Sequence, residues 1–271
     1  MYGRRPVPYA EREGVQIFWA EEGSGEPVLL IMGIGYPGAM WYRLLPYLTD
    51  RYRTIRFDNR GVGTTGVVPG PYTLEGMADD AAAVLDAAGE RSAHVVGASM
   101  GGFIAQELTL RHPERVRSLV LACTHMNGPE AIPPSPEAME MLVRRSSMTP
   151  LEAAEAAVPF IYAADTPRVR IEEDFGVRMR QPTSPEGYTN QLQAVLAHGG
   201  TYDRLPDIRV PTLVVHGTDD RLVNPDNAPV LAERIPGARL QMIEGASHVF
   251  FTDRTEEAGR ILREFLDSVS E

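Results

Sequence analysis

The stretch His-Val-Val-Gly-Ala-Ser-Met-Gly-Gly at residues 94–102 decides the fold. It begins as a short apolar run, turns through small residues around Ser99, and continues into the helical pattern of residues 103–108. A strand that enters a helix through a Gly-x-Ser-x-Gly turn pushes the serine hydroxyl out of the sheet, beside the free amides of the helix N-terminus. The alternative is a serine that only caps the helix. Its position between a strand and a helix favours an exposed nucleophile.

Short apolar segments alternate with helical patterns along most of the chain. Apolar residues recur at helical spacing in residues 74–88 and again in residues 258–269. This alternation predicts a mostly parallel sheet with helices on both faces. Residues from about 5 to 20 instead predict an antiparallel hairpin that turns at Glu13-Gly14. The predicted buried parallel strands are Val28–Met32, Thr54–Phe57, Ala93–Val96, Val116–Ala122, Thr212–His216 and Leu240–Ile243.

One long segment, residues 126–205, interrupts the alternation because it contains no convincing strand. A connection of this length exceeds the usual crossover between two strands. We interpret it as a helical cap inserted into a core formed by residues 1–125 and 206–271. Helical runs are predicted within it at Glu137–Arg145, Leu151–Ala157 and Glu186–His198.

Composition excludes several classes of function. The chain has 271 residues and a net charge of −11, which disfavours nucleic acids and anionic membranes as partners. All 26 basic residues are arginines, so Schiff-base chemistry and pyridoxal phosphate attachment are excluded. The single cysteine, Cys123, excludes an intramolecular disulfide and a cysteine-rich metal site.

The sequence also carries no obvious membrane or export segment. The longest apolar runs have the length of strands, far below the ~20 residues that a membrane helix requires. No apolar signal-peptide core follows the arginines near the first residues. We therefore expect a cytoplasmic protein without a membrane partner, and we leave open whether it forms a homo-oligomer.

A serine nucleophile needs a base, and the base needs a carboxylate to orient it. In open α/β sheets such groups lie at the carboxyl ends of later strands. The predicted strand at residues 212–216 is followed by Asp219 and Asp220, and the strand at residues 240–243 is followed by His248. The pattern leaves either aspartate open as the acid. An ordinary loop histidine is the alternative for His248.

With these residues the chain resembles the α/β-hydrolase superfamily, in its capped carboxylesterase and lactonase branch, over almost its full length. Residues 58–65 are similar to the family's D-x-R-G-x-G-x-S turn, with Thr65 in place of serine. The family's G-x-x-D-x-x-V motif falls on residues 217–223, which selects Asp220 over Asp219.

The resemblance implies a fold and a set of site residues. The fold would be a mostly parallel, eight-stranded α/β-hydrolase sheet flanked by helices, with the inserted cap. Ser99, Asp220 and His248 would form a catalytic triad. The Ile34 and Met100 amides would form the oxyanion hole, in a loop where Met32-Gly33 replaces the family's usual His-Gly. We expect no metal or organic cofactor.

Substrate contacts are expected from Gly33, His125 and Met126. For His125 a structural or hinge role is the favoured interpretation, and Met126 has packing within the cap as its alternative. The expected activity is hydrolysis of carboxylic esters or lactones that carry small to medium hydrophobic groups. The negative net charge favours neutral substrates over anionic ones, unless a local arginine such as Arg43, Arg144 or Arg145 outweighs it.

Other activities stay open. A C–C bond hydrolase or a cofactor-free haloperoxidase or perhydrolase would use the same triad. A small-molecule receptor of the same fold is the non-enzymatic alternative. Epoxide hydrolases and haloalkane dehalogenases are disfavoured because they resemble this chain with aspartate at the position of Ser99.

Overall fold

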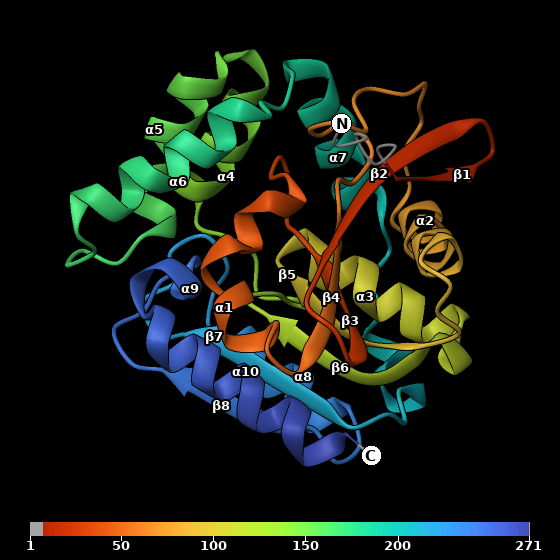
Figure 1. Cartoon of the computed structure of the whole chain (residues 1–271). Helices are drawn as coiled ribbons and strands as arrows, with labels where there is room; N and C mark the ends of the chain where they lie inside the picture. Colours follow the sequence, from red (N-terminus) through yellow and green to blue (C-terminus); the bar gives the residue numbers. More distant parts are fainter. Residues whose placement is uncertain (1–7, 271) are drawn as a thin grey trace.

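A computed structural model describes residues 8–270 (Figure 1). Eight strands form one sheet in the order β1-β2-β4-β3-β5-β6-β7-β8. The β1–β2 and β2–β4 pairs are antiparallel and the others are parallel, so the predicted sheet and hairpin are confirmed. The first residues predicted for the hairpin, 5–7, lie outside the described residues. The strands are β1 (Tyr9–Arg12), β2 (Val15–Glu22), β3 (Glu26–Ile31), β4 (Tyr52–Phe57), β5 (Ala93–Ala98), β6 (Val116–Ala122), β7 (Thr212–Gly217) and β8 (Arg239–Ile243).

Helices cover both faces of the sheet. The helices α2 (Leu74–Ala87), α3 (Met100–Arg111) and α8 (Asn227–Arg234) contribute to one apolar core cluster. The opposite cluster takes side chains from α1 (Leu45–Leu48), α9 (Phe250–Asp253) and α10 (Thr255–Val269). Short 3₁₀ turns are η1 (Gly38–Arg43), η2 (Pro113–Arg115), η3 (Arg145–Ser147) and η4 (Tyr202–Asp207).

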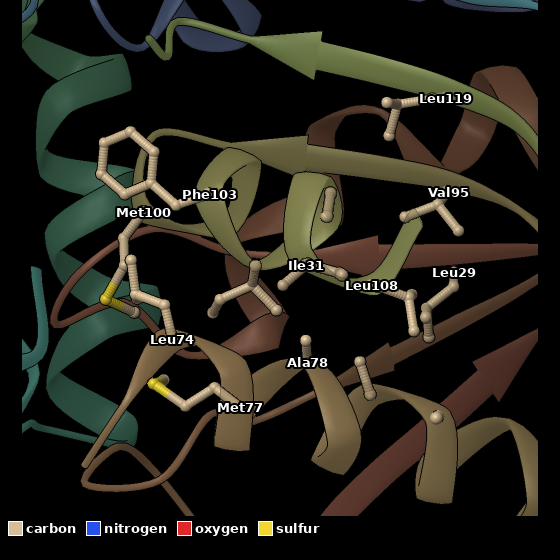
Figure 2. Packing of buried hydrophobic residues seen from close by; sticks show 14 of the residues in the cluster. Leu29, Ile31, Leu74, Met77, Ala78, Val95, Met100, Phe103, Leu108 and Leu119 are labelled. Atoms are coloured by element: carbon tan, nitrogen blue, oxygen red, sulfur yellow. The ribbon is translucent and has the colours of Figure 1, made fainter. Parts of the chain in front are cut away.

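The first core cluster fixes the position of α3 against the sheet. Figure 2 shows Ile31 and Val95 from adjacent strands among the side chains of α2 and α3, including Met77 and Leu108. All of these residues are 1% exposed or less. Because α3 begins directly after Ser99, this packing holds the turn that carries the serine.

The segment between β6 and β7 contains four helices: α4 (Pro136–Arg144), α5 (Pro150–Ile161), α6 (Arg168–Arg180) and α7 (Pro185–Ala197). They lie in the upper part of Figure 1, with α4, α5 and α6 grouped at one side. Three of them match the predicted helical runs, whereas the sequence did not predict α6. The division into a core and a separate cap remains a prediction.

The strand β8 differs from the prediction of a buried parallel strand. It pairs only with β7 and forms the edge of the sheet. Its first three residues, Arg239–Gln241, are exposed, and only Ile243 is fully buried.

None of the helices in the described part of the chain is long and apolar enough to cross a membrane.

Candidate active site

Ser99 lies at a strained turn between β5 and α3. Its backbone has φ 55° and ψ −121°, a region that residues other than glycine rarely adopt. The flanking glycines are required by close packing of the backbone. A Cβ atom on Gly97 would lie 2.2 Å from the Gly101 carbonyl oxygen, and one on Gly101 would lie 2.2 Å from the Ile31 carbonyl oxygen. The Gly-x-Ser-x-Gly pattern is therefore explained by space within the turn.

Asp220 and His248 lie in direct contact. The Nδ1 atom of His248 is 2.8 Å from Asp220 Oδ2. Because a carboxylate only accepts hydrogen bonds, this contact places the proton on Nδ1 and leaves Nε2 free to act as a base. The other carboxylate oxygen, Oδ1, accepts hydrogen bonds of 2.9 Å from the amides of Leu222 and Val223. Asp219, by contrast, is exposed.

The environment of Asp220 favours its charged form. Burial raises the pKa of this carboxyl, but the charge of His248 and the hydrogen bonds from His216 and His248 outweigh burial. The pKa of Asp220 therefore lies well below its ordinary value. Asp220 is thus suited to hold an imidazole in one orientation and to stabilise its cation.

A second histidine, His216, also contacts Asp220, and the sequence did not predict this contact. His216 Nε2 is 2.9 Å from Asp220 Oδ2 and 3.2 Å from the carbonyl oxygen of Val223. Both partners are acceptors, so Nε2 carries the proton. His216 is fully buried, and its Nδ1 atom has no hydrogen-bond partner among the described residues. Only one of its two ring nitrogens is therefore satisfied within residues 8–270.

Ser99 and His248 line the same cavity. Gly33, Ile34 and Tyr36 from the loop after β3 form another part of its wall. Among the described residues no hydrogen bond joins the Ser99 hydroxyl to His248. Such bonds are often long before a substrate binds and shorten in the complex.

The amides of Met100 and Ile34 are the predicted donors of the oxyanion hole. Met100 is the first residue of α3, so its N–H has no acceptor within the helix. The Ile34 N–H donates to no backbone acceptor within residues 8–270. Both residues line cavities that include Ser99. The predicted oxyanion hole is therefore consistent with this geometry, although its role remains a prediction.

The loop that carries Ile34 is held from two sides. Asn59 Nδ2 donates to the Met32 carbonyl oxygen at 3.0 Å. From α7, Gln191 Oε1 accepts from the Gly35 amide at 2.8 Å. These contacts brace the loop in a chain that lacks the family's usual histidine there. The sequence did not reveal them because both partners come from distant segments.

A second cavity also includes Ser99 and Ile34. His125 lines it, and its ring lies edge-on to Phe103 with the ring centroids 4.7 Å apart. Burial and the nearby His216 lower the pKa of His125 to about 4, so its ring is neutral near pH 7. Most of the remaining wall is apolar and includes Met139, Leu142, Leu192, Val195 and Leu196.

The structure places Met126 differently from Gly33 and His125. Met126 is fully buried in the core and lines neither of the two cavities that contain Ser99. Its carbonyl oxygen accepts from the Thr201 amide at 2.9 Å. Because the side chain packs inward, we do not retain the predicted substrate contact of Met126. Gly33 and His125 line these cavities, and their contact with a substrate remains a prediction.

One acidic cluster outside this site has the composition of a metal centre. Glu75, Glu107 and His198 bring candidate ligand atoms within 4.8 Å of one another. However, Glu107 already binds His198 Nε2 at 2.8 Å and Arg204 Nη1 at 3.0 Å. Burial raises the pKa of Glu107, but these two partners outweigh it and lower the pKa to about 2. A guanidinium at this position opposes a bound cation, so we interpret the cluster as an ion pair that fastens α3.

Comparisons with known proteins agree with the fold. A family model described as alpha/beta hydrolase fold matches residues 26–255. The chain is 34% identical over 249 residues to a putative carbamate hydrolase, RutD, of Azorhizobium caulinodans, covering 90% of this chain and 92% of that protein.

Solved structures give the same result. The enol-lactonase from Burkholderia xenovorans LB400 has a TM-score of 0.86 at 27% identity, covering 96% of this chain and 100% of the other. A thermophilic esterase from Thermogutta terrifontis, in a malate-bound form, has a TM-score of 0.85 at 28% identity, covering 98% of both chains. The chain belongs to the α/β-hydrolase family and is a hydrolase. The predictions of fold and family are confirmed.

Proposed function

We propose that this protein is a serine hydrolase that cleaves carboxylic esters or lactones of small molecules through Ser99, His248 and Asp220. The observation that carries the proposal is that Ser99, at its strained turn, shares a cavity with a histidine whose Nδ1 is bound to a buried carboxylate. The similarity to an enol-lactonase and an esterase supports the same class of reaction.

In the proposed reaction, Ser99 Oγ attacks the carbonyl carbon while His248 Nε2 takes its proton. The Ile34 and Met100 amides stabilise the negative oxygen of the tetrahedral intermediate. His248 then gives the proton to the leaving alcohol, which departs and leaves an acyl group on Ser99. Water, activated by His248, attacks the acyl group, releases the carboxylic acid and restores the serine.

The two cavities beside Ser99 suggest how a substrate is held. When the carbonyl group of a substrate lies at Ser99, the two groups attached to that carbonyl would each lie in one of the cavities. The cavity that His125 lines has mainly apolar walls, so it suits a hydrophobic substrate group of small to medium size. A cytoplasmic location remains a prediction, and whether the protein forms a homo-oligomer remains open.

Carbamate hydrolysis is a second candidate, favoured by the 34% identity to a putative carbamate hydrolase. A carbamate presents a carbonyl carbon to the same nucleophile and would use the same oxyanion hole. The two candidates differ in the group that Ser99 must attack.

The test is a panel of 4-nitrophenyl esters with increasing acyl length, matched 4-nitrophenyl carbamates and simple lactones. We expect turnover of esters and lactones by the wild-type protein and no turnover by Ser99→Ala. Faster turnover of the carbamates would favour the second candidate. Equal rates for wild type and Ser99→Ala would contradict the proposal.

A further inference from the structure

Two arginines from the segment between β6 and β7 are buried beside the proposed active site. Arg145 is 4% exposed and Arg178 is 5% exposed. Both guanidinium groups lie over the ring of Tyr36, at 5.9 Å for Arg145 and 4.2 Å for Arg178. Arg145 also lies over the ring of Tyr188 at 4.7 Å. The two cations therefore gather around one aromatic side chain, which belongs to the loop after β3.

Among residues 8–270, no ion pair with an acidic side chain involves Arg145 or Arg178. Arg43 provides the contrast, because it binds Asp174 at 3.1 Å and Glu173 at 2.8 Å. Asp174 lies on the same helix as Arg178, but its two carboxylate oxygens already accept hydrogen bonds from four other groups.

Three buried donors at this place lack a partner among the described residues. They are Arg145 Nε, Arg178 Nη1 and the Tyr36 hydroxyl. Native proteins rarely leave buried polar groups unsatisfied, and buried charges are normally paired. Unpaired buried donors of this kind therefore indicate a ligand that supplies acceptor atoms and negative charge.

The cluster is connected to Ser99 through Arg145 and Tyr36. Both residues line the cavity that contains Ser99 and His248. Arg145 also lines an adjacent cavity, whose wall includes Arg178. One end of a molecule at Ser99 would thus meet a positively charged wall.

A carboxylate fits this wall better than a neutral group. Guanidinium groups present planar pairs of donors that match the two oxygens of a carboxylate. The net charge of −11 argues for neutral substrates, but that field acts at long range and is screened over about 8 Å at physiological salt. The local pair of arginines outweighs it.

We propose that Arg145, Arg178 and Tyr36 bind a carboxylate group of the substrate. The preferred substrates are then esters or lactones that carry a carboxylate at one end. This inference rests on the hydrolase function proposed above and specifies the class of substrate. It reverses the expectation of neutral substrates that the composition alone suggested.

Two esters of equal length test the proposal. The 4-nitrophenyl monoester of adipic acid differs from 4-nitrophenyl hexanoate only in its terminal carboxylate. We expect the wild type to prefer the adipate monoester. Arg145→Gln and Arg178→Gln should each lower kcat/KM for that ester about 10- to 100-fold, mainly through KM, because each removes a charged hydrogen-bond donor. Hydrolysis of the hexanoate should change less than about threefold.

Arg144→Gln is the matched control, because its side chain is 64% exposed and its one ion pair, with Glu140, lies on the surface. It should leave the rates with both esters unchanged. Equal losses of both esters in Arg145→Gln would indicate a structural role and overturn the proposal. A wild-type protein that hydrolyses the hexanoate at least as fast as the adipate monoester would also overturn it.

Binding of adipate itself separates this inference from the proposed function, because adipate contains no ester. Calorimetry should detect adipate binding to the wild type, weaker by about 10-fold or more for Arg145→Gln. If neither ester were hydrolysed but adipate still bound in this way, the proposed function would fail and the carboxylate site would stand. If the wild type bound no adipate, the proposed carboxylate site would be refuted, whether or not the protein hydrolyses esters. This result does not depend on the folding of any variant.

Discussion

His216 Nε2 donates a hydrogen bond of 2.9 Å to Oδ2 of Asp220. The same oxygen accepts from His248 Nδ1 at 2.8 Å, so two histidines hold one carboxylate oxygen. Because Oδ1 is held by two backbone amides, the carboxylate has no freedom to rotate. His216 therefore acts as a positioning residue for the proposed acid and does not itself touch the reacting atoms.

Replacing His216 should lower turnover without abolishing substrate binding. We expect His216→Phe to lower kcat for 4-nitrophenyl hexanoate about 10-fold with little change in KM, because one charged hydrogen bond is lost. His216→Gln keeps a donor near the position of Nε2 and should recover most of the activity. Equal losses in the two variants would assign His216 a purely structural role.

The choice between the two adjacent aspartates is tested by a matched pair. Asp220→Asn should lower kcat by about 10⁴, because the amide no longer holds His248 in the required tautomer. Asp219 is exposed, so Asp219→Asn should change kcat less than about twofold. Steady-state kinetics on one ester suffices. The reverse order of the two effects would show that the acid is misassigned.

Gln191 is expected to support the oxyanion loop from α7. Its side chain accepts from the Gly35 amide and donates to the Arg60 carbonyl oxygen at 2.6 Å. We expect Gln191→Ala to lower kcat about 10-fold, since a small displacement of the Ile34 amide weakens stabilisation of the transition state. Gln193 is exposed on the same helix, and Gln193→Ala is the control. Unchanged kcat in Gln191→Ala would refute the bracing role.

Glu107 should contribute to stability in a pH-dependent way. Its pKa is lowered in the folded protein to about 2, from an ordinary value of 4.5. The carboxylate therefore stabilises the fold above pH 4.5, and this contribution is lost as the pH falls toward 2. At pH 7 we expect Glu107→Gln to lower the free energy of unfolding by roughly 3 kcal/mol.

Below pH 4.5 the difference in the free energy of unfolding between wild type and Glu107→Gln should become smaller. Urea unfolding at several pH values would measure this difference. Glu114 is exposed and makes no ion pair among the described residues, so Glu114→Gln serves as the control. A difference in the free energy of unfolding that stays constant from pH 7 to pH 3 would contradict the stabilising role of the charged Glu107 carboxylate.

Much of the fold could be predicted because its signals are local. The turn around Ser99 is recognisable from five consecutive positions, and the predicted β6 has the bounds observed. β8 was predicted as buried because apolar periodicity does not reveal whether a strand lies at the edge of a sheet. The helix α6 was missed because its buried stripe, Ile171, Asp174, Phe175 and Arg178, has helical spacing but is half charged.

The site was predictable only where the family motifs cover it. The contacts of His216 with Asp220 and of Gln191 with the oxyanion loop depend on tertiary packing, which no local pattern contains. The ion pair between Arg60 and Asp80 on α2 depends on tertiary packing in the same way. The unpaired state of Arg145 and Arg178 likewise becomes visible only when all neighbouring side chains are placed.

The central claim, that Ser99 is the nucleophile, is tested most directly by labelling with a fluorophosphonate probe followed by mass spectrometry of the digested protein. A serine activated by a neighbouring base reacts with such probes, whereas a serine that only caps a helix does not. We predict a single labelled residue, Ser99, with labelling abolished in Ser99→Ala and strongly slowed in His248→Gln. Labelling of a different serine, or no labelling of the folded wild-type protein, would contradict the claim.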